Sequence, residues 1–195
     1  MRRRSAVWFA AGILCFALCL ALTGYNLQQS RQAQAAAQDA LQKMVDADAP
    51  LPSETQHENE PETMMIDGKA YIGAIEIPSL KLQLPVLADW SAALLKTAPC
   101  RYAGSCYTDD FVICGHNYAS HFDALRHIEM GADVYFTTVG GEVFHYITVN
   151  RESLRPAEVE RMREPDGTWD LTLFTCDIGG GSRCTVRCER ADETY

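Results

Sequence analysis

The chain has 195 residues, of which 47% are hydrophobic and 22% charged, and its formal net charge at pH 7 is −9. This length allows one domain with accessory segments, since a single core usually occupies about 100–200 residues. The composition is ordinary for a globular protein and favours neither wholesale disorder nor a multi-span membrane protein. The negative charge argues against a nucleic-acid surface, because binding a phosphate backbone requires clustered lysines and arginines.

The N-terminus has the charge pattern of a membrane anchor. Three arginines at positions 2–4 precede an uncharged stretch from Ser5 to Ser30, and Ala6 to Leu22 is almost wholly apolar. A helix of this size can span about 30 Å of hydrocarbon. A cleaved signal peptide is the alternative, but its apolar region is typically about 7–15 residues long and ends in a small-x-small site, which does not directly follow Leu22. We therefore predict an uncleaved anchor over residues 1–25, with the arginines in the cytoplasm and the rest of the chain outside.

The next segment, residues 26–65, has the composition of a stalk and a linker. Residues 27–45 are rich in Ala, Gln and Leu and lack Gly and Pro, which favours a helical stalk that continues from the anchor. Between Asp46 and Asp67 there are seven acidic residues and three prolines but no Lys or Arg, which is typical of a solvated linker. We place the boundary of the folded domain near Met65 and assign residues 66–195 to that domain.

After Gly68 the sequence changes to short apolar segments separated by turn residues. Several alternate with period two and are rich in Val, Ile, Tyr, Phe and Thr, which favours strands. Gly140-Gly141 lies between two of them, as a tight hairpin requires. Short helices are expected around Ser91–Lys96 and His121–Ile128, with a further turn at Pro156–Arg163. The fold class is mainly β, a small barrel or sandwich, and its predicted strands are YIGAIEIP, LQLPVL, DDFVICGH, DVYFTT, VFHYITV, WDLTLFTC and CTVRCER.

Three reactive side chains lie at the ends of predicted strands: His116, Cys176 and Arg183. A thiolate is a nucleophile when a partner takes its proton or lowers its pKa, and histidine can be that partner. Arginine, which is always charged, can hold a developing oxyanion. Together the three residues have the chemistry of an acyl-transfer site, although eight cysteines and five histidines make some such trio expected by chance.

The local sequence around these residues is similar to the sortase family. LTLFTCD, residues 171–177, resembles the sortase signature Thr-Leu-x-Thr-Cys, and Arg183 follows Cys176 by seven residues and opens RCTV, like the family's Arg-x-hydrophobic-Val strand. FVICGHNYASHF resembles the way the family presents its histidine, and IEIPSLKLQLPVL resembles its opening strands. The similarity covers residues 70–190 in the family's order of His, Cys and Arg.

The resemblance implies a sortase-type eight-stranded β-barrel and a cysteine transpeptidase. Cys176 would attack a sorting-signal peptide of Leu-Pro-x-Thr-Gly type in a surface protein and form a thioester, which an amine of peptidoglycan or of a pilin lysine would resolve. His116 would act as general acid and base, Arg183 would hold the oxyanion or orient the substrate, and Thr175 would help to form the oxyanion site. The resemblance implies no cofactor. GHNY resembles class B enzymes, whereas the compact domain resembles class D.

A second arginine on the last strand and two pairs of cysteines leave alternatives for the catalytic arginine and for disulfide bonds. Arg187 shares a side of the last strand with Arg183, so motif register alone selects Arg183, and for Arg187 and Arg190 we expect solvated or phosphate-facing positions. Outside the cell a disulfide is permitted, with Cys100–Cys106 and Cys184–Cys188 as local options. The parity of Cys184 and Cys188 around Val186 favours the core-facing side of a strand instead.

Other classes of protein fit less well. A zinc site is disfavoured, because Cys114-x-His116 is too tight and no paired C-x2–4-C units complete four ligands. L,D-transpeptidases have Ser-x-Gly-Cys where this chain has LFTC, and papain-like hydrolases place Cys before His. The non-enzyme alternative is a membrane-anchored extracellular β-domain for adhesion or scaffolding, in which Cys176 is a buried, unreactive thiol.

Overall fold

The computed structural model describes residues 2–46, 59–163, 169–177 and 180–191. The chain divides into two compact units, residues 1–32 and residues 33–195. Most of the predicted acidic linker, residues 47–58 with His57, lies outside the described residues.

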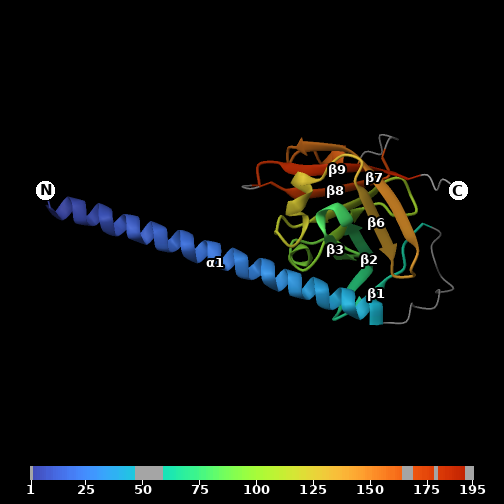
Figure 1. The fold of residues 1–195 in the computed structure, drawn as a ribbon, viewed down its shortest axis with the longest axis horizontal. Helices are drawn as coiled ribbons and strands as arrows, with labels where there is room; N and C mark the ends of the chain where they lie inside the picture. The colour runs from blue at the N-terminus through green and yellow to red at the C-terminus, as the bar shows by residue number, and fades with distance from the viewer. Residues whose placement is uncertain (1, 47–58, 164–168, 178–179, 192–195) are drawn as a thin grey trace. The chain divides into compact units, whose positions relative to one another are not determined.

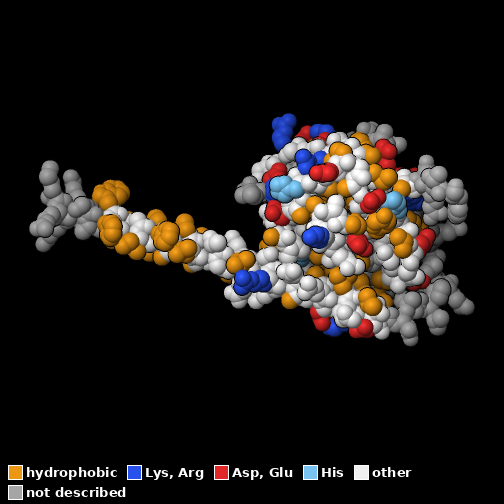
Figure 2. Space-filling view, viewed as in Figure 1, with side chains coloured by type: hydrophobic (Ala, Val, Ile, Leu, Met, Phe, Trp, Pro, Cys, Tyr) orange, Lys and Arg blue, Asp and Glu red, His pale blue; other side chains and the backbone are white. Residues whose placement is uncertain are grey.

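Helix α1 (Arg2–Asp46) begins in the first unit and ends in the second. It contains an 18-residue window with a mean hydropathy of 2.2 and none of its surface buried, so the helix is long and apolar enough to cross a membrane. Figure 2 shows hydrophobic side chains along the visible side of this part of the helix. The window would be about 27 Å long at 1.5 Å per residue, close to the thickness of a bilayer's hydrocarbon core. The predicted helical stalk is the continuation of the same helix.

The second unit is a closed β-barrel (Figure 1). Its eight strands are ordered β2-β3-β4-β5-β8-β9-β7-β6, and pairing of β2 with β6 closes the barrel, which confirms the predicted fold. A short strand β1 (Met64–Ile66) forms a hairpin with β2, through a turn in which Asp67 and Gly68 both have positive φ. The barrel strands are β2 (Lys69–Ile77), β3 (Leu82–Leu87), β4 (Cys100–Ala103), β5 (Phe111–Gly115), β6 (Asp133–Thr138), β7 (Val143–Leu154), β8 (Leu171–Cys176) and β9 (Arg183–Arg190).

Barrel closure depends on Gly73. A Cβ atom at this position would lie 2.1 Å from the carbonyl oxygen of Thr137 on β6, which no side chain can do. The register of β2 also shifts between Tyr71 and Gly73. Such a bulge with a glycine lets the strand bend and pair with both neighbours.

Alternating strand residues divide into two apolar clusters. The interior cluster fills the barrel and includes Ile75, Phe111, Ile113, Leu173 and Val186, each at most 1% exposed. An eight-stranded barrel is just wide enough for side chains to fill it. The outer cluster lies on the other side of several of the same strands and contains Tyr71, Leu87, Ala98, Cys100, Val112, Cys114, Leu154, Met162 and Phe174.

Four short helices join the strands where the sequence analysis expected turns or helices: η1 (Pro78–Leu80), η2 (Leu94–Lys96), η3 (Phe122–His127) and α2 (Val159–Arg163). Phe122 and Leu125 of η3 are fully buried in the interior cluster. This burial fixes η3 on the barrel.

The end of α1 belongs to the same unit as the barrel. Ala33, Ala37 and Ala40 are 4%, 2% and 3% exposed, and their spacing puts them on one side of the helix. The ammonium of Lys43 forms an ion pair of 2.6 Å with Asp67 in the β1–β2 turn. The compact unit that contains the barrel therefore begins at Ala33.

Candidate active site

Three adjacent strands, β5, β8 and β9, bring the predicted site residues to one end of the barrel. Gly115 of β5 pairs with Thr175 of the parallel strand β8, so the next residues along the two strands are His116 and Cys176. Cys176 ends β8 and is the register partner of Arg183, which begins β9. The topology thus places the three residues side by side although 67 positions separate the first from the last.

Cys176 differs from the other cysteines of the barrel unit in being exposed. Burial raises the pKa of the Cys106 thiol to about 12, and burial also raises the pKa values of Cys114 and Cys188. Those thiols stay protonated and out of reach of solvent. All cysteines of the unit are free, and Cys184 and Cys188 face the interior cluster, as their parity predicted.

His116 is partly buried against an aromatic side chain. Its ring stacks on Tyr118, with centroids 3.6 Å apart and planes at 20°. Burial first, and then the charge of Lys96, lower its pKa below the ordinary 6.5, against a hydrogen bond with Asn117 that raises it. The imidazole is therefore neutral at pH 7 and available as a base.

The glycine before His116 is required by packing. A Cβ atom on Gly115 would lie 2.4 Å from the ring of Phe122, so only glycine allows η3 to approach the end of β5 this closely. The backbone N–H of Phe122 also donates to the His116 carbonyl at 3.1 Å. This contact explains why a glycine precedes His116.

Arg183 is partly exposed beside Cys176. Its Nη1 donates to the carbonyl of Pro156 at 2.7 Å, and its guanidinium carbon lies 6.0 Å from the ring centroid of Phe174.

Arg187, by contrast, is 1% exposed, so the expectation of a solvated position was wrong. Its Nε and Nη2 donate to Glu152 at 3.1 and 3.0 Å, and its Nη1 donates to Thr172 at 2.8 Å. Its guanidinium carbon lies 4.8 Å from the Trp169 ring centroid. Arg190 is exposed as a residue, but its guanidinium packs 5.0 Å from the ring centroid of Phe144.

Thr175 lies on the opposite side of β8 from Cys176. It is fully buried, and its hydroxyl has no hydrogen-bond partner among the described residues. Its side chain therefore supports the strand end from within the barrel.

Arg126 of η3 is a residue that the sequence analysis missed. Its Nη2 donates to the backbone carbonyl of Cys176 at 3.0 Å, and its Nη1 pairs with the carboxylate of Asp177. The two residues are about fifty positions from Arg126 in sequence, and no local pattern reports the contact.

A row of aromatic rings extends from Arg183 across the outer side of the barrel. The rings of Phe174 and Tyr102 meet edge to face with their centroids 5.2 Å apart. The rings of Tyr102 and Trp90 meet in the same way, with their centroids 5.7 Å apart. Trp90 and Tyr102 line a surface pocket of about 400 Å³ together with Glu60, Asp89 and Arg101. The exposed thiol of Cys176 thus lies at one end of an aromatic row.

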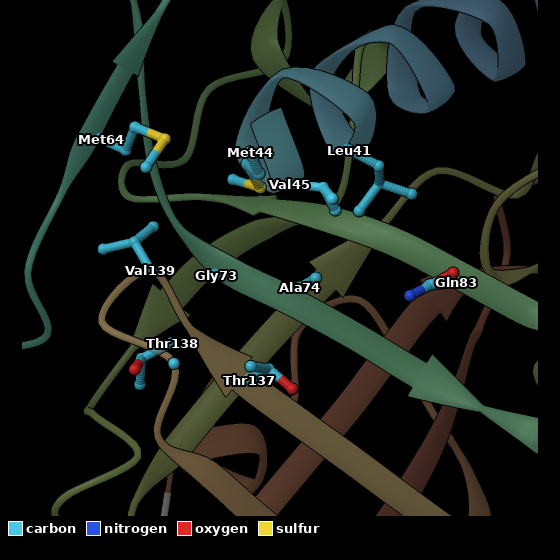
Figure 3. Close-up of a pocket in the computed structure, with 11 residues that line it drawn as sticks. Leu41, Met44, Val45, Met64, Gly73, Ala74, Gln83, Thr137, Thr138 and Val139 are labelled. Carbon is cyan, nitrogen blue, oxygen red and sulfur yellow. The ribbon is translucent and has the colours of Figure 1, made fainter. Parts of the chain in front are cut away.

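A second cavity, of about 320 Å³, lies away from these residues. Figure 3 shows Leu41, Met44 and Val45 at the end of α1 on one side of it and Ala74, Thr137 and Val139 on the other. It contains none of the predicted site residues. Within the described ranges, no group of three or more His, Cys, Asp or Glu side chains is placed to hold a metal ion.

Comparisons with a family model and with solved structures agree on one family. The sortase domain model matches residues 75–191. The fold is similar to sortase A from Corynebacterium diphtheriae, at 26% identity and a TM-score of 0.58 over 64% of this chain and 62% of that one. It is also similar to sortase C1 from Streptococcus suis, at 25% identity and a TM-score of 0.53 over 64% and 76% of the two chains.

A sortase D5 transpeptidase from Clostridium perfringens has the same fold at 17% identity, with a TM-score of 0.55 over 62% of this chain and 79% of that one. The match to the Corynebacterium diphtheriae sortase A covers 62% of that protein, so the chain spans less than two thirds of its length. A comparison with curated proteins found no match.

Proposed function

Because the chain belongs to the sortase family, we propose that it is a membrane-anchored cysteine transpeptidase whose nucleophile is Cys176. One observation carries this proposal. The exposed thiol of Cys176 ends β8 directly opposite Arg183 and beside the end of β5, which His116 follows. This arrangement supports the proposal that a nucleophile, a neutral base and a fixed positive charge act together there.

The proposed reaction has two steps. His116 accepts the thiol proton as the Cys176 sulfur attacks the scissile carbonyl, and it then gives that proton to the leaving amine, so that a thioester remains on Cys176. An incoming amine attacks the thioester, His116 removes its proton, and the thiol is restored as the new amide forms. Arg183 stabilises the oxyanion of both tetrahedral intermediates. Thr175, whose hydroxyl is buried, contributes through its backbone and by supporting the strand end.

We propose a sorting signal of Leu-Pro-x-Thr-Gly type as substrate, cleaved between Thr and Gly. The row formed by Phe174, Tyr102 and Trp90 supports this substrate class, since aromatic surfaces favour the apolar and proline residues of such a peptide. The acceptor is an amine of a peptidoglycan precursor or of a pilin lysine. The chemistry requires no cofactor.

The anchor determines where this reaction occurs. The apolar part of α1 can cross a bilayer, and the arginines at positions 2–4 favour the cytoplasmic side for the N-terminus. The catalytic unit would then face the cell exterior, where surface proteins and wall precursors are found.

Mass spectrometry of the full chain in detergent tests the proposal. The chain is incubated with Leu-Pro-x-Thr-Gly and Asn-Pro-x-Thr peptides, with and without triglycine. We expect a thioester adduct on Cys176 and a peptide–triglycine product, both absent from Cys176→Ala and present in the buried-cysteine control Cys184→Ala. If no peptide forms an adduct and Cys176 also resists alkylation, the non-catalytic adhesion or scaffolding domain becomes the better interpretation.

A further inference from the structure

Asp177, the residue after Cys176, forms hydrogen bonds through its backbone and through its carboxylate. Asp177 donates its backbone N–H to the Ser182 carbonyl at 2.8 Å and accepts the Gly180 N–H at 2.8 Å. Its carboxylate accepts hydrogen bonds from the hydroxyls of Ser182 and Ser153. The side chain is 24% exposed, so these bonds are partly shielded from water.

Arg126 completes this arrangement from η3. Its guanidinium, 20% exposed, pairs with Asp177 and donates to the Cys176 carbonyl at 3.0 Å. Its Nε donates to Asp123 at 2.9 Å, which orients the planar group. One rigid cation therefore contacts the nucleophile's own peptide group and the residue after it.

The helix that carries Arg126 is itself fixed on both sides. Phe122 and Leu125 are fully buried in the interior cluster, and Arg151 of β7 donates to the carbonyls of Arg126 and Ile128. The Phe122 N–H also binds the His116 carbonyl. Residues 116–127 thus connect the end of β5, with His116, to the end of β8, with Cys176.

We propose that Arg126 is a positioning residue that fixes the Cys176 peptide group, and with it the direction of the thiol, relative to His116 and Arg183. The inference rests on the proposed transpeptidase function. A displacement of about 1 Å at a reacting atom can lower a rate by about 10²-fold. Arg126 also neutralises Asp177, whose unpaired carboxylate would otherwise disfavour the thiolate next to it.

The test compares variants of the full chain in detergent by two measurements. The first is kcat and KM for a sorting-signal peptide, and the second is the rate of Cys176 alkylation by iodoacetamide as a function of pH. Arg126→Ala is expected to lower kcat by about 10–100-fold with KM within about twofold. It should also move the alkylation profile to higher pH. Arg126→Lys keeps the charge but not the fork of donors, so it should restore the alkylation profile more than it restores kcat.

Two further variants keep the outcome clear if Arg126→Ala folds poorly. Asp177→Asn removes the ion pair and the negative charge together, so it should lower kcat without raising the pH of alkylation. Arg155→Ala is the matched control, because that side chain is 84% exposed, and it should change neither measurement. Unchanged kcat and alkylation in Arg126→Ala would overturn the inference. A wild-type chain without any thioester would overturn the proposed function instead, while the alkylation measurement would still test the role of Arg126.

Discussion

The outer side of β8 and β9 has an arginine at each of its two ends, and the two arginines make different contacts. At one end Arg183 pairs in register with Cys176, and at the other Arg187 pairs with Thr172. Arg183 is partly exposed and donates to a backbone carbonyl. Arg187 is 1% exposed, and each of its three guanidinium nitrogens has a protein acceptor.

This difference separates a residue that can serve substrate from one that holds the fold. A guanidinium whose nitrogens are all bonded to protein groups cannot reorganise around an oxyanion without leaving buried acceptors unpaired. Arg187 instead joins β7, through Glu152, to β8 and to α2, where the Arg161 carbonyl is its acceptor. The site at the Cys176 end is open, and the site at the Thr172 end is closed.

The largest effect on stability is expected at the closed end. Arg187→Ala leaves Glu152, 20% exposed, without its cation and removes the packing against Trp169. Breaking a buried pair by removing one partner typically costs about 3–5 kcal/mol, and we expect a value near 3 because Glu152 keeps some solvent. Urea unfolding measures this loss, with Arg155→Ala as the exposed control. A loss below about 1 kcal/mol would show that the two ends do not differ as described.

The opposite pattern is expected at the open end. Arg183→Ala should lower kcat by about 10²–10³-fold, the usual effect of removing one oxyanion donor, while the urea midpoint stays close to wild type. Arg183→Lys should recover little, since a lysine lacks the planar fork. Steady-state kinetics with a sorting-signal peptide measures kcat, and a variant with normal kcat would remove Arg183 from the mechanism.

The local pattern of the sequence predicted most of the barrel. LQLPVL and DVYFTT coincide with β3 and β6, because each is a short apolar segment separated by turn residues from the next one. Strands β1 and β4 were missed, since three and four residues are too short to establish a period. Ala33, Ala37 and Ala40 look like any Ala-rich helix, and their burial follows from contacts with distant strands.

The candidate site was predictable to a different degree for each residue. His116, Cys176 and Arg183 were found from motifs that lie within single strands and their turns, and their roles remain proposals. The contact of Arg126 with Cys176 joins elements fifty positions apart, so it depends on the barrel having closed. Likewise, Arg187 could not be separated from Arg183 by strand parity, because its burial depends on Glu152 and Trp169.

Burial at the open end gives a third prediction, on pH. His121 is fully buried. Within the described residues, neither of its ring nitrogens has a partner at the distance and angle of a hydrogen bond. Burial, with a smaller effect of nearby His116, lowers its pKa from 6.5 to about 4, against a backbone interaction with Ala33 that raises it. Between these values the unfolded chain binds a proton that the folded chain does not, so the stability present above pH 6.5 is lost as the pH falls towards 4.

The size of this effect follows from the two pKa values. At about 1.4 kcal/mol for each pH unit between them, the loss is on the order of 3 kcal/mol. His121→Phe should remove most of it, so that urea unfolding at pH 7 and at pH 4.5 differs less than in wild type. His127→Phe is the control, since His127 is exposed. An unchanged pH dependence in His121→Phe would show that His121 is not held neutral.

The smallest effect tests the closed end by a single atom. Thr172→Val keeps the shape of a side chain that is 3% exposed but removes the oxygen that accepts the Arg187 Nη1 proton at 2.8 Å. An unsatisfied buried donor costs about 1–3 kcal/mol, and we expect about 1 because Glu152 still holds the guanidinium through its other two nitrogens. Thr137→Val, at a partly exposed position, should change the free energy of unfolding by less than about 0.5 kcal/mol.

Because Thr172 is four residues before Cys176 on the same side of β8, the same variant also tests whether the two ends act separately. A normal kcat in Thr172→Val would show that stability at one end of this surface is separate from chemistry at the other. A large loss of kcat would instead mean that the Arg187 site also positions Cys176.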